Sequence, residues 1–187
     1  KMRLAIIGIQ GSGKGTQAKL IAKEFKLKRV SVGKILRKEI KNKSKEGNIL
    51  AKYVNKGAMA PNHIVNRVIL KNTPKNNFIV DGFPRDEKQL KVADKLNLEK
   101  VILLTLPKKE VHRRIKLRKK LEDRIDDKKE ALETRLKIFY KHSPEIIRYF
   151  RDKLIKVKGN QSRKKVFSDI KKSLLNRKKF KGTIIEG

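Results

Sequence analysis

The stretch that decides the fold is Gly8-Ile9-Gln10-Gly11-Ser12-Gly13-Lys14-Gly15-Thr16-Gln17. It follows the apolar run 4–7, which is bounded by a glycine and has the composition of a buried parallel strand. After it, apolar residues recur with the spacing of one helical face, at Ala18, Ile21, Ala22 and Phe25. The order of strand, glycine-rich turn and helix predicts a loop that binds phosphate.

The residue types of this loop suit a polyphosphate. Glycines let backbone N–H groups approach the anion, and the free N–H groups at the start of the helix add positive potential. Lys14 supplies a mobile charge for the β- and γ-phosphates. The pattern G-x-x-x-x-G-K is met from Gly8 to Lys14, but Gly15 stands where a hydroxyl residue is usual and Thr16 comes one position later. An ordinary glycine-rich turn is the less favoured alternative.

Length and composition indicate one domain. The 187 residues are enough to bury a substantial core, and no apolar run approaches the ~20 residues that span a bilayer. We recognise no signal peptide before the first strand. The absence of cysteine excludes disulfides and thiolate metal sites, and a cytoplasmic location is the expectation.

The chain is strongly basic. Its 52 Lys and Arg residues against 19 Asp and Glu residues give a formal charge of +33, which attracts any polyanion. One interpretation is association with nucleic acid or the ribosome, and the other is a compositional bias toward lysine. The second is favoured because lysine is spread along the chain and no known nucleic-acid motif is present. We therefore expect nucleic-acid binding to be at most non-specific.

Four more strands are predicted, a short candidate at residues 27–30 and three more at residues 78–80, 101–106 and 154–157. Helical patterns separate them, and Ser31 is a candidate N-cap for the helix that passes through Ile40. Between residues 41 and 77, Gly47, Gly57 and Pro61 are expected to break the chain into short helical pieces such as 49–54 and 64–70. Alternating strands and helices predict an α/β fold with a doubly wound parallel sheet of about five strands.

Asp81 is the candidate metal residue. It directly follows the buried strand 78–80, and the carboxyl end of a parallel strand lies beside the phosphate loop. Its carboxylate can reach Mg²⁺ through the water shell of the ion, and the hydroxyl of Thr16 is a second candidate. By contrast, His63, His112 and His142 lack the spacing of metal ligands and are expected to be surface or packing residues.

With the loop and the segment Asp81-Gly82-Phe83-Pro84-Arg85 both present, the chain resembles the nucleoside monophosphate kinases, most closely adenylate kinase, over nearly its whole length. The resemblance implies a P-loop kinase fold with a helical monophosphate-binding insertion at residues 31–60 and a lid. The lid at residues 118–127 is of the short form and leaves no room for an extra lid domain or a structural zinc. The whole chain, 1–187, is then one kinase domain.

The resemblance also implies an activity and a site. The activity is the reversible, Mg-dependent transfer of the γ-phosphoryl group from ATP to AMP, which gives two ADP. The enzyme is expected to be a monomer in the cytoplasm. The implied catalytic residues are Lys14, Arg85, Arg118, Arg124 and Arg135. The implied ATP-binding residues are Gly11, Ser12, Gly13, Lys14, Gly15, Thr16, Arg118 and Gln161. The implied AMP-binding residues are Val32, Arg37, Ala58, Met59, Ala60, Gly82, Phe83, Pro84, Arg85, Gln89, Arg124 and Arg135.

The chain departs from the adenylate kinase pattern at three positions. Gln10 replaces a loop proline, Val32 stands where threonine is usual near the acceptor base, and Lys34 stands where aspartate is usual. Three rival functions remain open: a pyrimidine (UMP/CMP) monophosphate kinase, an adenylate-kinase-like ATPase of ribosome assembly, and a binding protein without catalysis. Gln89, four residues after Arg85, favours an adenine acceptor, because the pyrimidine enzymes resemble one another in using asparagine there.

Overall fold

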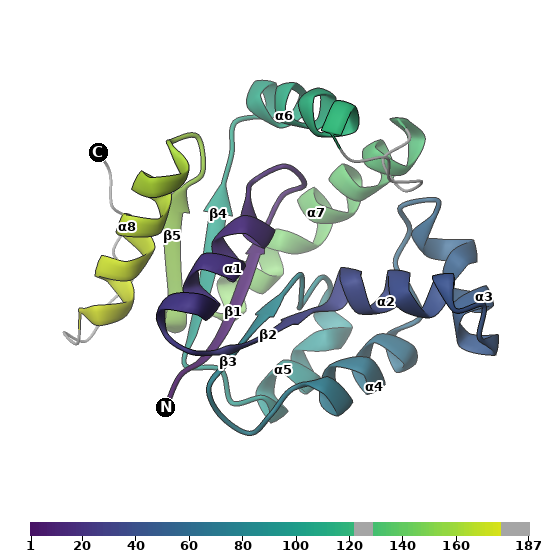
Figure 1. Ribbon diagram of the computed structural model, residues 1–187, viewed down its shortest axis with the longest axis horizontal. Helices are drawn as coiled ribbons and strands as arrows, with labels where there is room; N and C mark the ends of the chain where they lie inside the picture. The colour runs from purple at the N-terminus through teal and green to yellow at the C-terminus, as the bar shows by residue number, and fades with distance from the viewer. Residues whose placement is uncertain (122–128, 177–187) are drawn as a thin grey trace.

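Five parallel strands form a single sheet in the computed structural model, which describes residues 1–121 and 129–176, with side chains described outside 118–129 (Figure 1). The strands lie in the order β2-β3-β1-β4-β5. Their bounds are β1 Arg3–Gly8, β2 Lys28–Ser31, β3 Phe78–Asp81, β4 Lys100–Thr105 and β5 Leu154–Lys158. The phosphate loop therefore follows the central strand, β1, and Asp81 ends the neighbouring strand, β3.

The three inner strands, β1, β3 and β4, are largely apolar because both faces of the sheet are covered. Side chains alternate along a strand, so Leu4 and Ile6 of β1 pack on one face while Ala5 and Ile7 pack on the other. All four of these side chains are at most 5 % exposed. Such two-sided burial explains why the sequence shows continuous apolar runs instead of a polar and apolar alternation.

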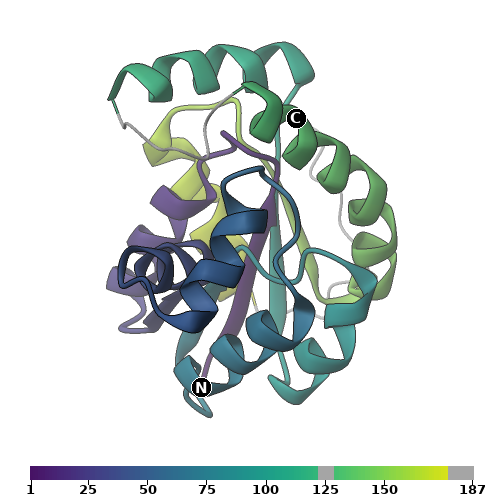
Figure 2. The ribbon, with the colours of Figure 1, turned by 90° about the vertical axis from the view of Figure 1, so that its right-hand side faces the viewer.

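Helices cover the two faces unequally (Figures 1 and 2). One face is packed by α1 (Lys14–Glu24) and α8 (Arg163–Leu175). The other face is packed by α2 (Val32–Lys41), α4 (Asn62–Asn72), α5 (Leu90–Lys95) and α7 (Lys129–Tyr149), and α3 (Lys45–Val54) packs on α2. Two short 3₁₀ turns, η1 (Glu87–Gln89) and η3 (Arg151–Lys153), lie before α5 and before β5.

A third, smaller apolar cluster lies at the carboxyl end of the sheet. There α6 (Lys108–Leu121) places Val111 and Ile115 against Ile9 of the phosphate loop and against Leu132 and Leu136 of α7. Figure 1 shows α6 above the carboxyl ends of the strands. The cluster thus fixes the outer side of the phosphate loop by packing.

The predicted fold class is confirmed, and the five predicted strands are present with ends that differ by at most one residue. One local prediction is wrong, and another is right in position but not in its hydrogen bond. Gly47 does not break the chain but lies inside α3, where a Cβ would stand 2.1 Å from the carbonyl oxygen of Glu39 in α2. Ser31 occupies the N-cap position of α2, but its hydroxyl makes no capping bond and contacts Asp81 instead.

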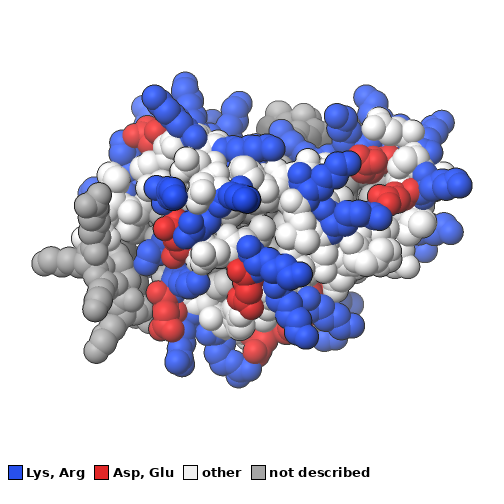
Figure 3. Space-filling view, turned by 90° about the horizontal axis from the view of Figure 1, so that it is seen from below, with Lys and Arg blue, Asp and Glu red and all other residues white. Residues whose placement is uncertain are grey.

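The surface repeats the basic composition. On the face in Figure 3, Lys and Arg side chains are spread across the outline with acidic side chains between them. Among the described helices, none combines the length and the apolar character needed to cross a membrane.

Candidate active site

The phosphate loop is shaped by close backbone approach on one side and open space on the other. A Cβ on Gly8 would lie 2.8 Å from the carbonyl oxygen of Leu104 and 2.8 Å from Oγ of Ser12. Gly13, by contrast, has φ +88° and faces no other atom within 4 Å of a Cβ position. The loop is therefore held tightly against β4 and leaves a concavity at the start of α1, where free N–H groups favour an anion.

A cleft of about 570 Å³ opens in front of this loop. Its lining includes Gly11, Gly13, Lys14, Gly15 and Thr16, whereas Ser12 is buried behind them. The basic side chains that line it are Lys14, Lys19, Arg29, Lys34, Arg37, Arg85, Arg114 and Arg163. Among the described residues of the lining, Asp81 is the one acid, so the cleft suits a polyanion.

Asp81 lies under the start of α1 and is paired with Arg29. Its side chain is 8 % exposed, and its Oδ2 accepts a hydrogen bond of 2.6 Å from Nη2 of Arg29. Ser31 donates to the same oxygen at 3.4 Å. The pair forms because β2 and β3 run side by side with Ser31 opposite Asp81, which brings Arg29, two residues earlier, onto the same face.

The site fits a magnesium ion held through water. The contacts of Asp81 within the described chain go to Oδ2, which leaves Oδ1 as an acceptor, and Thr16 lines the same cleft. Hard oxygen donors of this kind are the ligands that Mg²⁺ prefers. No group of three or more His, Asp or Glu side chains that could hold a metal directly occurs among the described residues.

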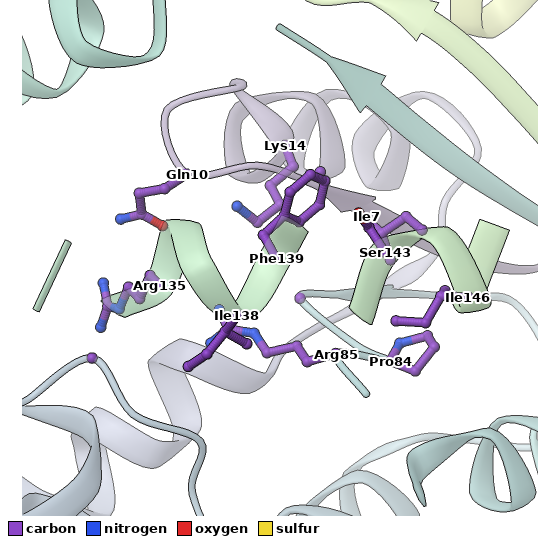
Figure 4. Close-up of a pocket in the computed structure, with 13 residues that line it drawn as sticks. Ile7, Gln10, Lys14, Pro84, Arg85, Arg135, Ile138, Phe139, Ser143 and Ile146 are labelled. Atoms are coloured by element: carbon purple, nitrogen blue, oxygen red, sulfur yellow. The ribbon is translucent and has the colours of Figure 1, made fainter. Parts of the chain in front are cut away.

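A second cavity lies between the phosphate loop and α7 (Figure 4). Lys14, Arg85 and Arg135 line it together, although they come from three separate parts of the chain. In Figure 4 their cationic ends lie around one end of the cavity, while Ser143 and Ile146 line the other end. Three cations that converge beside a phosphate loop can stabilise the charge of a phosphoryl group in transfer.

A third cavity has both apolar and polar side chains in its walls and adjoins the other two through Gly82 and Arg85, which line all three. Its lining contains nine of the predicted AMP-binding residues: Val32, Arg37, Ala58, Met59, Ala60, Gly82, Arg85, Gln89 and Arg135. Leu36, Val54 and Val65 add further apolar surface. Of the remaining predicted residues, Pro84 lines the cavity beside α7 and Phe83 is buried. A slot that combines apolar side chains with convergent polar groups suits a nucleobase and its attached phosphate.

Gln89 is the uncharged polar side chain in the described lining of this slot. It is 1 % exposed, and its Oε1 accepts a 2.8 Å hydrogen bond from the backbone N–H of Arg85. Its Nε2 donates to Oδ1 of Asn62 at 2.7 Å, and Nδ2 of Asn62 donates to Oδ2 of Asp86 at 2.9 Å. The amide is therefore held at both ends by the protein.

Arg114 is positioned at the cleft by Glu110, one turn earlier on α6. Glu110 accepts hydrogen bonds of 2.7 Å from both Arg113 and Arg114, and these bonds lower the pKa of its carboxyl to about 2. Glu110 therefore stays ionised at neutral pH. The Arg114 side chain lies next to Gly11 of the phosphate loop, 3.6 Å from a Cβ position there.

Gln161 lies in the loop after β5, which touches the phosphate loop near Ser12. Its Nε2 donates to the carbonyl oxygen of Lys158 and to Asp169 of α8. Burial acts to raise the pKa of Asp169, but hydrogen bonds from Lys165 and Gln161 outweigh it, and the pKa lies below its usual value. The side chain of Arg118 and all of Arg124 lie outside the described residues, as does most of the predicted lid.

Sequence reasoning missed several residues of the site. Arg29, Lys19, Arg114 and Arg163 line the cleft but belong to no motif. Asn62 reaches Gln89 across 27 positions of sequence. In so basic a chain, no sequence signal separates these residues from other surface cations, because their place depends on which strands and helices become neighbours.

The fold and the converging cations define a class: a P-loop nucleoside monophosphate kinase, which is a phosphotransferase. The family model described as adenylate kinase matches residues 6–155. The chain belongs to the adenylate kinase family, whose members generally use Mg-ATP.

Curated relatives cover nearly the whole chain. An adenylate kinase of Azobacteroides pseudotrichonymphae genomovar. CFP2 is 36 % identical over 94 % of this chain and 98 % of its own length. An adenylate kinase of Buchnera aphidicola subsp. Cinara cedri is 32 % identical over 94 % of this chain and 100 % of its own length. An adenylate kinase of Bifidobacterium longum is 35 % identical over 78 % of this chain.

Proposed function

We propose that this protein transfers the γ-phosphoryl group of ATP to AMP and so forms two ADP. The observation that carries the proposal is that three cavities meet at Arg85. They are the cationic cleft at the phosphate loop, the cavity beside α7 that Lys14, Arg85 and Arg135 line, and the slot that Gln89 lines. The names of the curated relatives support the same donor and acceptor.

In this proposal the phosphate loop holds the donor. The backbone N–H groups of residues 11–16 and the amine of Lys14 bind the β- and γ-phosphates. Bound Mg²⁺ supplies positive charge at these phosphates, with Asp81 and Thr16 as the residues that would hold it through water. Arg118 and Gln161 are the further proposed donor contacts.

The acceptor slot holds AMP with its phosphate toward Arg85. Val32, Ala58, Met59 and Ala60 surround the base, and Gln89 hydrogen-bonds its edge. Arg37 and Arg85 are planar donors that can grip the phosphate in a bidentate manner. Their position between slot and cleft directs the acceptor oxygen at the γ-phosphorus.

The transfer step needs no proton. An oxygen of the AMP phosphate forms a bond to the γ-phosphorus while the bond from that phosphorus to the bridging β-oxygen breaks, and the ADP formed from ATP leaves with the electron pair. Charge spreads over the transferring oxygens, and Lys14, Arg85 and Arg135 lie where it can be stabilised. Arg124 is proposed to join them when the lid at residues 118–127 closes and excludes water.

The insertion at residues 31–60, the short lid, the monomeric state and the cytoplasmic location all stay predictions. The pyrimidine acceptor is the rival that the slot disfavours, because the Gln89 amide offers a donor and an acceptor to an adenine edge. The ribosome-assembly alternative has the net charge of +33 as its support.

A coupled assay with ATP and a panel of AMP, CMP, UMP, GMP and IMP tests the proposal. We expect the highest kcat/KM with AMP, and two ADP formed for each AMP consumed. The matched variant Gln89→Ala should raise the KM for AMP more than the KM for ATP, since only the acceptor base loses a partner. Equal kcat/KM for CMP or UMP would overturn the adenylate assignment, and ATP hydrolysis without an acceptor would favour the ATPase.

A further inference from the structure

Asn62 does not line any of the three cavities, but it is hydrogen-bonded to Gln89, the residue proposed to bind the edge of the acceptor base. It is the first residue of α4, and it lies between Asp86, just before η1, and Gln89, at the end of η1. Asp86 is itself fixed, because its Oδ1 accepts from the backbone N–H of Gln89 at 3.0 Å. The three side chains form one hydrogen-bonded chain behind the slot.

The direction of every bond in this chain is forced by its two ends. An ionised carboxylate such as Asp86 only accepts, so the group of Asn62 that faces it must be the NH₂. The oxygen of Asn62 then faces Gln89 and must meet the NH₂ of Gln89. At the other end the backbone N–H of Arg85 only donates, so it must meet the oxygen of Gln89. Both ends demand the same orientation of the Gln89 amide.

These bonds use only part of the hydrogen-bonding capacity of the Gln89 amide. In the described part of the chain, Gln89 uses one of its two amide hydrogens on Asn62 and one lone pair of Oε1 on Arg85. One N–H and one lone pair remain, in a fixed order along the wall of the slot. An amide that was free to turn by 180° would offer the same two groups in the reverse order.

We propose that Asn62 is a positioning residue that fixes the polarity of the Gln89 amide and thereby makes the acceptor site select a 6-aminopurine monophosphate over a 6-oxopurine monophosphate; the inference rests on the proposed acceptor function of the slot. A 6-aminopurine presents an amino donor beside a ring-nitrogen acceptor, which matches the remaining lone pair and N–H of Gln89. A 6-oxopurine presents a carbonyl acceptor beside a ring N–H donor, which is the reverse order. With the amide held, the wrong base meets like groups at both positions and leaves them unpaired.

The ratio of kcat/KM for AMP to that for IMP measures this selectivity, because the two acceptors differ only at the edge of the base. Asn62→Leu removes the partner of the Gln89 NH₂, and we expect the AMP-to-IMP ratio to fall about 10-fold. The change should appear in the KM for the acceptor, with the KM for ATP and the kcat with AMP little altered. Asn66→Ala is the matched control, since Asn66 lies one turn further along α4 and its Oδ1 has no hydrogen-bond partner.

A further variant separates polarity from packing. Asn62→Asp keeps an oxygen that can only accept from Gln89, so it should retain the AMP-to-IMP ratio although it sets a second carboxylate beside Asp86. A purely structural role of Asn62 would predict no such contrast between Asn62→Asp and Asn62→Leu.

The outcomes distinguish this inference from the proposed function. A native enzyme that does not prefer AMP refutes the proposed function itself. A native enzyme that prefers AMP, combined with a folded Asn62→Leu variant of unchanged AMP-to-IMP ratio, refutes the role of Asn62 alone. If Asn62→Leu fails to fold, a lost ratio in folded Asn62→Asp is equally decisive.

Discussion

Asp81 and Arg29 form an ion pair in the lining of the cleft. The carboxylate is 8 % exposed and the guanidinium 19 % exposed, so removal of one partner leaves a charge in a poorly solvated place. We expect Arg29→Gln to lower the free energy of unfolding by on the order of 3 kcal/mol. Urea unfolding of Arg29→Gln, of Asp81→Asn and of the double variant forms the test. The double variant should be more stable than the sum of the single losses predicts, and strict additivity would contradict the coupling.

Lys14 carries the largest expected effect on rate. Its amine lies 3.4 Å from the carbonyl oxygen of Ile9 in the phosphate loop. The side chain lines both the cleft and the cavity between the phosphate loop and α7. We expect Lys14→Met to keep the fold and to lower kcat by on the order of 10²-fold or more, because one preorganised cation at the transferring phosphates is lost. Lys23→Met, on the exposed side of α1, is the control. Near-native turnover of folded Lys14→Met would refute the assignment of the loop.

The loop between α3 and α4 contacts α7 through a glycine. Gly57 has φ +72°, and a Cβ there would lie 2.0 Å from the carbonyl oxygen of Ala131. We expect Gly57→Ala to lower stability by about 1–3 kcal/mol, since the backbone is strained and must also move. Because Ala58, Met59 and Ala60 follow directly, the KM for AMP should rise more than the KM for ATP. Thermal unfolding and steady-state kinetics measure both effects.

The neighbouring exposed residue gives the matched comparison for this loop. Lys56→Ala changes a side chain in solvent and should alter neither the stability nor the KM for AMP. A Gly57→Ala variant that behaves like Lys56→Ala would show that the approach of the loop to α7 is not needed.

On helix α6, Glu110 pairs with Arg113 and Arg114, and the stability that this interaction contributes depends on pH. Hydrogen bonds from Arg113 and Arg114 lower the pKa of Glu110 from 4.5 to about 2. A depressed carboxyl pKa stabilises the folded state above the unfolded pKa, and that contribution is lost as the pH falls toward the folded pKa. We expect the Tm difference between the native chain and Glu110→Gln to be constant above about pH 5 and to shrink between pH 4.5 and pH 2. A Tm difference that stays constant down to pH 3 would contradict a stabilising role of the Glu110 carboxylate.

The elements could be predicted from the sequence to the extent that local patterns determine them. Two-sided burial made β1, β3 and β4 visible as apolar runs, whereas β2 and β5 carry basic residues among their apolar ones. The motif residues after β1 and β3 identified the cleft. Gly47 was misjudged because the close approach of α3 to α2, which favours glycine there, is a tertiary contact. Arg29 and Asn62 were missed for the same reason, since their partners lie 52 and 27 positions away.

At the scale of the whole molecule, the charge of +33 has two separable components. Eight basic side chains gather in the cleft, where they face the substrates. Others are dispersed, and on the face in Figure 3 acidic side chains lie between them. A dispersed charge attracts polyanions and raises their encounter rate, but it does not position any base for recognition.

The dispersed component predicts weak RNA binding without sequence preference. Affinities for single-stranded RNAs of equal length and different sequence should agree, and should fall on the order of 10³-fold between 50 and 200 mM salt, because counterion release drives the binding. Replacing the exposed Lys23, Lys56 and Lys91 with glutamate should weaken RNA binding while kcat/KM for AMP changes little at high salt, where exposed charges are screened. Lys14→Met should do the opposite, with turnover lost and RNA binding nearly kept. Fluorescence anisotropy over a salt series measures the affinities. Salt-resistant binding to one defined RNA would contradict the prediction and would favour a role in ribosome assembly, because only positioned contacts survive when counterion release no longer contributes.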